Sequence, residues 1–240
     1  MTELERHEYD VVVIGAGGAG LRAVIEARER GLRVAVVTKS LFGKAHTVMA
    51  EGGCAAAMRN VNTKDSWQVH FGDTMRGGKF LNNWRMAELH AQEAPDRVWE
   101  LETYGALFDR TKDGKISQRN FGGHTYPRLA HVGDRTGLEI IRTLQQKIVS
   151  LQQEDKAELG DYDARIRVFH ECSITEIMPM ISVNNDPARG RVPKSAAIAS
   201  TNWSCASHMC CVAESSACRL SSGRASAMAC TSCQTRCTPI

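Results

Sequence analysis

No run of apolar residues in this 240-residue sequence approaches the length of about eighteen that a membrane-spanning helix needs. The first ten residues are charged and lead directly into a β-branched run, without an apolar leader segment. With 42% hydrophobic and 24% charged residues, the composition is that of an ordinary globular protein. We therefore expect a cytoplasmic location as the default.

Cysteine and excess positive charge are both scarce in residues 1–177. Only Cys54 and Cys172 lie there, and the other seven cysteines lie between Cys205 and Cys237. Six basic and two acidic residues follow position 177, so the overall net charge of +3 leaves residues 1–177 at about −1. A near-neutral body argues against nucleic acid as the main partner, because phosphate binding needs clustered Lys and Arg.

Residues 9–37 carry the pattern of one βαβ unit. Tyr9–Ile14 is a β-branched run bounded by glycine, which is typical of a buried parallel strand. Ala19–Arg30 has helix-forming residues and is followed by Gly31, in the position that a helix C-cap prefers. Arg33–Val37 is a second β-branched run. The pattern predicts an α/β, Rossmann-like fold with a parallel sheet and a right-handed crossover.

Later segments predict helices, a loop and one further strand. Trp84–Tyr104 has a helical composition that is interrupted at Ala94–Pro95, where the proline fits the first turn of a second helix. Gly105–Gly133 is rich in turn signals and is expected to be mostly loop. Leu138–Gln153 predicts an amphipathic helix, and Ile166–Phe169 predicts a strand.

The character of the sequence changes after Ile177. Residues 178–240 are rich in Ser, Ala, Cys and Arg and have no sustained helical or strand period. We expect disorder there, because such a segment buries too little apolar surface to offset its chain entropy. The chain therefore divides into an incomplete α/β domain at 1–177 and an aberrant tail at 178–240. Translation out of frame is one hypothesis for the origin of the tail.

A metal site is the alternative interpretation of the cysteine-rich tail. Cysteines spaced in this way can hold zinc or an iron–sulfur cluster. Zinc sites usually show paired knuckles flanked by strand or helix patterns, which are missing here, so we predict no metal. The candidate ligands are His208, Cys210, Cys211, Cys230, Cys233 and Cys237.

A glycine-rich turn lies between the first predicted strand and helix. Glycines at 15, 17 and 20 satisfy the G-x-G-x-x-G pattern in the context that dinucleotide binding requires. Gly15 permits the tight turn, Gly17 lets the backbone approach a pyrophosphate, and Gly20 allows close packing of helix on strand. Amides at the helix N-terminus then face the phosphates. The predicted phosphate-binding residues are Gly15, Ala16, Gly17, Gly18, Ala19 and Gly20.

The second predicted strand does not end in the carboxylate that usually binds the ribose of NAD. Val37 is followed by Thr38, Lys39 and Ser40. Thr38 can hydrogen-bond a ribose and Lys39 can meet a phosphate, but ordinary NAD binding is disfavoured. The glycine turn alone does not choose between NAD and FAD.

Several motifs in register give the chain its resemblance to a known family. Gly15–Gly20, Thr38-Lys39, Lys44–Gly53, Phe121-Gly122-Gly123 and Asp134–Gly137 follow one another in order and with family-like spacing. From about Tyr9 to Ile177 the sequence resembles the FAD-binding front end of succinate dehydrogenase and fumarate reductase flavoprotein subunits, of the bacterial type. The fold that this resemblance implies is an incomplete FAD-binding domain.

The resemblance assigns cofactor and substrate roles to particular residues. It implies that His46 carries FAD covalently, and that Thr47, Glu51 and Gly53 line the flavin through backbone amides. Gly52 and Phe121 fall where the family places the floor and wall of the dicarboxylate site. Gly52 would allow substrate and flavin to approach closely, and Phe121 would supply an apolar surface against the substrate.

Residue patterns alone leave simpler alternatives open for three of these positions. Without the family match, His46 is an ordinary loop histidine and Phe121 an ordinary core aromatic. Asp134-Arg135-Thr136 precedes the long predicted helix and can act as its cap.

The resemblance implies oxidation of succinate to fumarate, with electrons passed to an iron–sulfur subunit, then to quinone at a membrane anchor. It places the protein at the cytoplasmic side of the cell membrane, held there by its partner subunits. Family members are more than twice as long, and their capping domain supplies the catalytic histidine and arginines. None of those motifs follows Ile177, so we assign no catalytic residue and expect this truncated chain to be inactive alone.

Two other functions remain open. A soluble relative such as L-aspartate oxidase binds FAD without a covalent bond and generally lacks a histidine at the position of His46. The second open function is that of a non-catalytic fragment that only binds FAD or an assembly partner.

Overall fold

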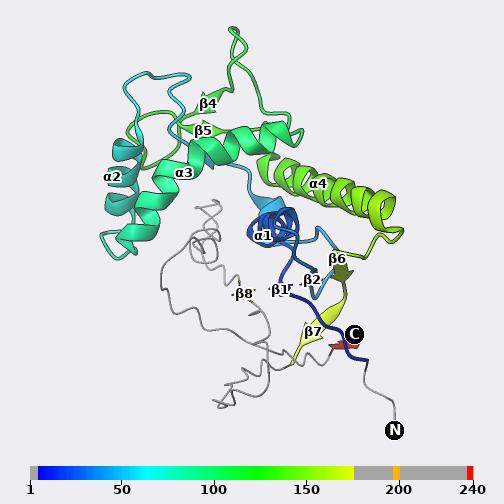
Figure 1. Cartoon of the computed structure of the whole chain (residues 1–240). Coiled ribbons are helices and arrows are strands. Elements are labelled where there is room, and N and C mark those ends of the chain that lie inside the picture. Colours follow the sequence, from blue (N-terminus) through cyan, green and yellow to red (C-terminus); the bar gives the residue numbers. More distant parts are fainter. Residues whose placement is uncertain (1–4, 176–196, 201–236, 240) are drawn as a thin grey trace, which may run out of the picture.

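The computed structural model describes residues 5–175, 197–200 and 237–239. Its main sheet has the strand order β6-β2-β1-β8, and every neighbouring pair is parallel. The strands are β1 (Val11–Ile14), β2 (Val34–Val37), β6 (Ile166–Phe169) and β8 (Ala197–Ser200). The predicted α/β fold with a parallel sheet is thereby confirmed (Figure 1).

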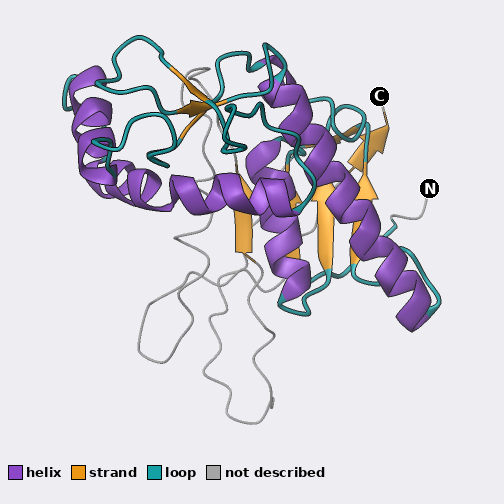
Figure 2. Ribbon diagram, turned by 90° about the horizontal axis from the view of Figure 1, so that it is seen from above, coloured by secondary structure: helices purple, strands orange, loops and turns teal. Residues whose placement is uncertain are grey.

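The first βαβ unit forms because its two strands are continuous β-branched runs and its helix has one apolar face. Helix α1 (Gly18–Glu29) packs its buried Leu21, Val24 and Ile25 against the sheet. Gly31 follows the helix with a φ of 77° and donates its amide to the carbonyl of Arg28, as the predicted glycine cap requires. Helix α4 (Thr136–Leu159) lies against α1, so both helices cover one face of the sheet (Figures 1 and 2).

A second half of the molecule contains two packed helices and a small sheet. Helices α2 (Trp67–Gly77) and α3 (Trp84–Thr103) pack against each other. The small antiparallel sheet has the order β3-β5-β4 and consists of two-residue strands, β3 (Cys54–Ala55), β4 (Gln118–Arg119) and β5 (Leu129–Ala130). The segment 105–133 is otherwise loop, as predicted. None of the helices in the described ranges is both long and apolar enough to cross a membrane.

The predicted break at Ala94–Pro95 is wrong, because α3 runs without interruption through Pro95. Proline removes one backbone hydrogen bond and bends a helix, and α3 changes direction along its length in Figure 1. Ala87, Ala91 and Ala94 on one side of this position continue into Val98 and Leu101 on the other, all of them buried. This continuous apolar face holds the two halves together as one helix.

Other boundaries differ from the sequence-based predictions. Helix α4 begins before and ends after the predicted range of 138–153, and α2 was not predicted at all. The helix α2 does carry a start signal, because Ser66 is its N-cap and accepts a hydrogen bond from the amide of Val69 at 3.4 Å.

Only two short stretches of the predicted aberrant tail lie within the described residues. They are β8, which pairs with β1, and β9 (Cys237–Pro239), which pairs with β7 (Cys172–Ile174). The rest of the segment 178–240 lies outside the described residues, as do five of the six candidate metal ligands (all except Cys237). The expected disorder and the division of the chain at 177 stay predictions.

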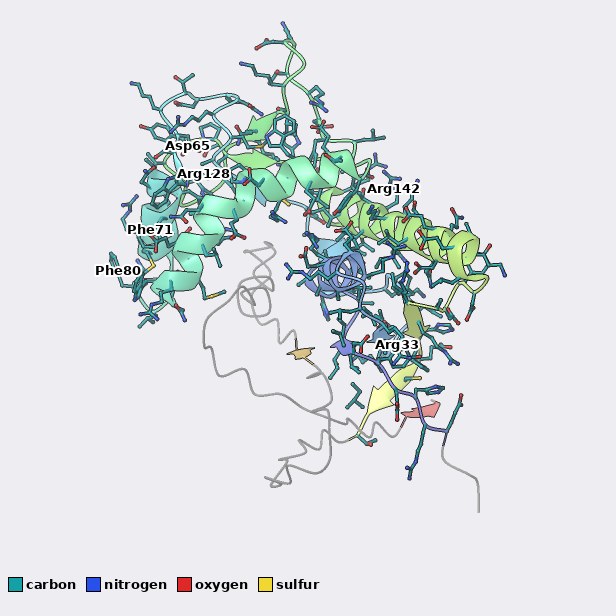
Figure 3. All side chains as sticks on the ribbon, in the orientation of Figure 1. Arg33, Asp65, Phe71, Phe80, Arg128 and Arg142 are labelled. Carbon is teal, nitrogen blue, oxygen red and sulfur yellow. The ribbon has the colours of Figure 1, made fainter. Side chains whose placement is uncertain are left out.

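The half formed by α2 and α3 is organised around a fully buried arginine. Arg128 is 0% exposed, and its guanidinium lies 2.9 Å from carboxylates of both Asp65 and Asp73. Figure 3 shows Arg128 and Asp65 together in this half, far from Arg142 on the surface of α4. Asp73 also accepts hydrogen bonds from the amide and hydroxyl of Thr125, at 2.8 and 2.7 Å. Paired charges of this kind tie α2 to the loop that follows β4.

A buried histidine sits beside this ion network. His70 is 1% exposed, and its ring contacts the rings of His90 and His124. Burial, helped by the neighbouring His90, Arg128 and His124 and opposed by Asp73, lowers the pKa of His70 from 6.5 to about 2. Folding therefore holds this imidazole neutral.

We predict that His70 makes the folded state sensitive to acid. Below about pH 6.5 the unfolded chain binds a proton at this histidine and the folded chain does not, so the free energy of unfolding falls with decreasing pH by up to about 1.4 kcal/mol per unit. His70→Gln should flatten this dependence between pH 6 and pH 5, measured by urea unfolding. His170→Gln, at an exposed histidine, is the control and should keep the wild-type slope. Equal slopes in the wild type and His70→Gln would contradict the prediction.

Candidate functional site

A pocket of about 910 Å³ opens at the carboxyl ends of β1 and β2. This edge of a parallel sheet is where open α/β folds bind their ligands, and the volume lies at the upper end of the range for small-molecule sites, roughly 300–1,000 Å³. The pocket lies between the N-terminus of α1, the ends of β1 and β2, the turn after β2, and β7. It is lined by Ile14–Gly20, Val37–Ser40, Lys44–Thr47, Met49, Ala50 and Cys172–Ile174.

The glycine turn forms the pocket wall at the start of α1. Gly15 has a φ of 100° and donates its amide to the carbonyl of Val37 at 2.8 Å. A Cβ atom on Gly20 would lie 2.0 Å from the carbonyl oxygen of Gly15, so only glycine fits there. Gly17 is the N-cap and has no side chain to cap the helix. The helix therefore presents its first amides and its positive dipole end to the pocket.

Thr38 and Lys39 follow the last residue of β2, at the position where the sequence has no ribose-binding carboxylate. Thr38 is buried, and its amide donates to the carbonyl of Phe169 at 2.9 Å. Its own carbonyl accepts from the amide of Cys172 at 3.1 Å. Lys39 is exposed and lines the pocket. Thr38 and Lys39 thus lie where the sequence predicted them.

A short turn places His46 in the pocket lining, beside the start of α1. The 3₁₀ turn η1 (His46–Met49) follows β2, and His46 is exposed there. The hydroxyl of Thr47 accepts a hydrogen bond from the amide of Gly18 at 3.1 Å, which joins this turn to the start of α1. On the other side, Gly137 of α4 donates its amide to the carbonyl of Ala50 at 2.8 Å. The turn is therefore held between α1 and α4.

The electrostatic character of the pocket favours an anion. Lys39 and Lys44 line it, and no carboxylate does so within the described residues. The uncapped N-terminus of α1 adds a partial positive charge on the same wall. Glycines without side chains, free helix amides and two lysines fit the pyrophosphate of a dinucleotide. These features alone do not choose between NAD and FAD.

Four predicted site residues do not line this pocket: Glu51, Gly52, Gly53 and Phe121. Two of them nevertheless lie together, because a Cβ atom on Gly52 would be 3.5 Å from the ring of Phe121. Phe121 is 51% exposed, so its interpretation as a core aromatic is wrong. The predicted floor and wall of the substrate site are thus neighbours, beside the main pocket.

Asp134-Arg135-Thr136 does not cap α4 through side chains. Arg135 is the N-cap and its side chain makes no capping hydrogen bond. Asp134 instead binds Arg119 at 3.0 Å, and the hydroxyl of Thr136 accepts from the amide of Val132 at 3.1 Å. The capping interpretation is therefore wrong, because these side chains hold loops together in front of the helix.

Sequence reasoning missed the contribution of β7 and of Arg119. Cys172, Ser173 and Ile174 line the pocket because β6 pairs in parallel with β2 and so ends at the same edge of the sheet. The strand predicted at 166–169 was the available signal for this contribution, because the carboxyl ends of parallel strands meet at one edge of a sheet. Arg119 is an isolated arginine in a loop region, and no pattern in the sequence marks its contacts.

Comparisons with known proteins agree with this geometry. The FAD binding domain family matches residues 10–160. A chain of the fumarate reductase (CoM/CoB) of Methanothermobacter marburgensis is 43% identical over 190 residues, which cover 79% of this chain and 34% of that protein. The mitochondrial succinate dehydrogenase [ubiquinone] flavoprotein subunit of Oryza sativa subsp. japonica is 45% identical over 146 residues, which cover 58% of this chain and 23% of that protein.

Two solved structures align with most of this chain. The Mycobacterium smegmatis Sdh1 complex in the apo form aligns with a TM-score of 0.72 and 96% sequence identity, over 73% of this chain and 30% of that chain. The E. coli quinol fumarate reductase aligns with a TM-score of 0.63 and 32% identity, over 72% of this chain and 28% of that chain.

The chain spans about a third or less of the length of the curated relatives it matches. The matched region contains the glycine turn, both lysines of the pocket and the His46 turn, and the FAD-binding family resolves the choice between NAD and FAD. The chain belongs to the family of FAD-binding domains of succinate dehydrogenase and fumarate reductase flavoprotein subunits, of which it carries the N-terminal part.

Proposed function

We propose that this chain binds FAD covalently through His46, as the N-terminal part of a flavoprotein that interconverts succinate and fumarate. The observation that carries the proposal is the pocket that the glycine turn and His46 line together. Bound FAD would supply the redox chemistry, as an acceptor or donor of hydride.

Different residues of the pocket would bind different parts of the dinucleotide. The amides of Gly17, Ala19 and Gly20 at the start of α1 would hold the pyrophosphate. The amide of Gly18 is already bonded to the hydroxyl of Thr47. Thr38 would bind the adenosine ribose at the end of β2, and Lys39 would neutralise a phosphate. The backbone of β7 closes the same end of the pocket beside Thr38.

His46 is suited to a covalent bond by its position rather than by an unusual environment. Its side chain is exposed on the pocket wall, and a neutral imidazole nitrogen is a competent nucleophile. The turn that carries it is held in place, since Thr47 is bonded to Gly18 and Ala50 is bonded to Gly137. A histidine in this place favours the succinate dehydrogenase type over the L-aspartate oxidase type.

The dicarboxylate site would begin at the contact between Gly52 and Phe121. Gly52 would let the substrate approach the flavin, and the exposed ring of Phe121 would cover its methylene groups. Glu51 and Gly53 flank Gly52 and would contact the flavin through their backbone. Cationic groups for the substrate carboxylates would come from segments of the full-length flavoprotein that this chain does not carry.

Partner subunits follow from the family and not from the pocket. The named relatives are subunits of larger enzymes. We infer that the electron partner is an iron–sulfur subunit, and that membrane subunits hold the complex at the cytoplasmic side of the membrane. A chain that retains FAD but does not turn over succinate with a dye acceptor is a binding fragment only, which is our expectation for residues 1–240 alone.

The covalent bond gives the first prediction about function. After reconstitution with FAD and denaturation in acid, wild-type protein should retain yellow colour and flavin fluorescence on a gel, whereas His46→Ala should lose both. His170→Ala, at an exposed histidine away from the pocket lining, should retain them. Flavin that remains bound to denatured His46→Ala, or that leaves the denatured wild type, would contradict the assignment.

The packing of α4 on the His46 turn gives the second prediction. A Cβ atom on Gly137 would lie 1.8 Å from the carbonyl oxygen of Thr47, so Gly137→Ala must displace the turn. We expect FAD affinity to fall by about tenfold or more, equivalent to about 1.4 kcal/mol, measured by quenching of flavin fluorescence.

Gly77→Ala is the matched control for this substitution. Gly77 is exposed at the end of α2, and a Cβ atom there meets nothing within 4 Å. Its FAD affinity should equal that of the wild type. Unchanged affinity in Gly137→Ala would show that the turn does not hold the cofactor.

A further inference from the structure

Arg119 joins three segments that meet beside the pocket. Its Nε atom donates to the carbonyl of Gly52 at 2.8 Å, and one terminal nitrogen donates to the carbonyl of Glu51. The other terminal nitrogen lies 3.0 Å from the carboxylate of Asp134, just before α4. The guanidinium of Arg119 thus links β4, which carries it, to the loop after the His46 turn and to the segment just before α4.

The two carbonyl contacts fix the direction of two successive peptide groups. The carbonyl and the amide of a trans peptide point in opposite directions. Because the carbonyls of Glu51 and Gly52 both face Arg119, the amides of Gly52 and Gly53 both point away from it. Neither amide donates a hydrogen bond within the described part of the chain. Successive amides on one side of the backbone form a site for an electron-rich atom.

The backbone at this point accepts only glycine, which supports a specific geometry. Gly53 has a φ of 120°, and a Cβ atom there would lie 2.7 Å from the carbonyl oxygen of Ala130. The loop is therefore confined by β5 on one side and by Arg119 on the other. Without the guanidinium, the carbonyls of Glu51 and Gly52 would lose the donor that keeps them turned to one side.

The same arginine controls the ring of Phe121. Arg119 is two residues before Phe121, and Thr125 is four residues after it. Arg119 is bound to the Glu51–Gly52 backbone, and Thr125 is bound to the buried Asp73 at 2.7 and 2.8 Å. The loop that carries the exposed ring is thus fastened at both ends, which keeps the ring against Gly52.

We propose that Arg119 is a positioning residue, which aims the Gly52 and Gly53 amides at the flavin through the Glu51–Gly53 backbone. The proposal rests on the binding of FAD proposed above. It assigns Arg119 an action on the bound flavin, not only on the stability of the fold. A lysine cannot replace it, because only the planar fork of arginine reaches both carbonyls at once.

The experiment uses the whole 240-residue chain reconstituted with FAD. Arg119→Gln removes both carbonyl bonds, and we expect about tenfold weaker FAD binding together with a shifted visible absorption band of the bound flavin. Arg119→Lys keeps the charge and should recover little of either. In Arg119→Ala, millimolar guanidinium chloride should restore affinity and spectrum, and sodium chloride at equal concentration should not.

Arg142→Gln is the matched control. Arg142 is also partly exposed, binds the carbonyl of Gly105 at 3.1 Å and pairs with Glu139, but it is not part of the pocket lining. Its variant should keep wild-type affinity and spectrum. Thermal unfolding of each variant without FAD shows whether a loss of affinity follows from a loss of structure. If Arg119→Gln does not fold, Arg119→Lys takes its place as the test variant.

Two failures are distinguishable. If the wild type does not bind FAD, the proposed function falls and this inference falls with it. If the wild type binds FAD and the folded Arg119 variants match it in affinity and spectrum, the proposed function stands and the role of Arg119 is overturned. Effects on thermal stability alone, with the flavin spectrum unchanged, also overturn it.

Discussion

The α-carbon of Gly20 and the carbonyl of Gly15 approach so closely that no side chain fits between them. This contact lets α1 begin directly at the end of β1 and lie flat on the sheet. It determines where the N-terminus of α1 and the positive end of its dipole lie. It also places the amide of Gly18 where the hydroxyl of Thr47, in the His46 turn, accepts its hydrogen bond. The pocket is thus a consequence of how one strand passes into one helix.

The second half of the molecule depends on a different kind of interaction. Arg128, Asp65 and Asp73 are buried charges that pair with one another, and a neutral His70 lies beside them. Breaking such a group by removing one member is far more costly than its net contribution suggests, because an unpaired charge stays buried. Asp73 also holds Thr125, so the ion network determines where the loop of Phe121 can lie.

Local patterns in the sequence predicted the first βαβ unit, β6 and most of α4, because β-branched runs and an amphipathic stripe act over neighbouring residues. They also singled out Gly15–Gly20, Thr38 and Lys39, whereas His46 and Thr47 were named only through the family resemblance. All of these residues line one pocket. The unbroken α3 was not predictable, since an apolar face on both sides of Pro95 overrides the local effect of proline. The contacts of Arg119 and Arg128 join residues far apart in sequence, and no local pattern encodes them. The roles of individual residues toward FAD and dicarboxylate stay predictions.

The walls of the pocket come from opposite ends of the described body, namely the β1–α1 turn and the β7 segment. A ribosome must therefore complete β6 and β7 before the nascent chain can enclose a ligand at Thr38, because β6 joins the sheet next to β2. A ligand bound there stabilises the union of the two ends by mass action.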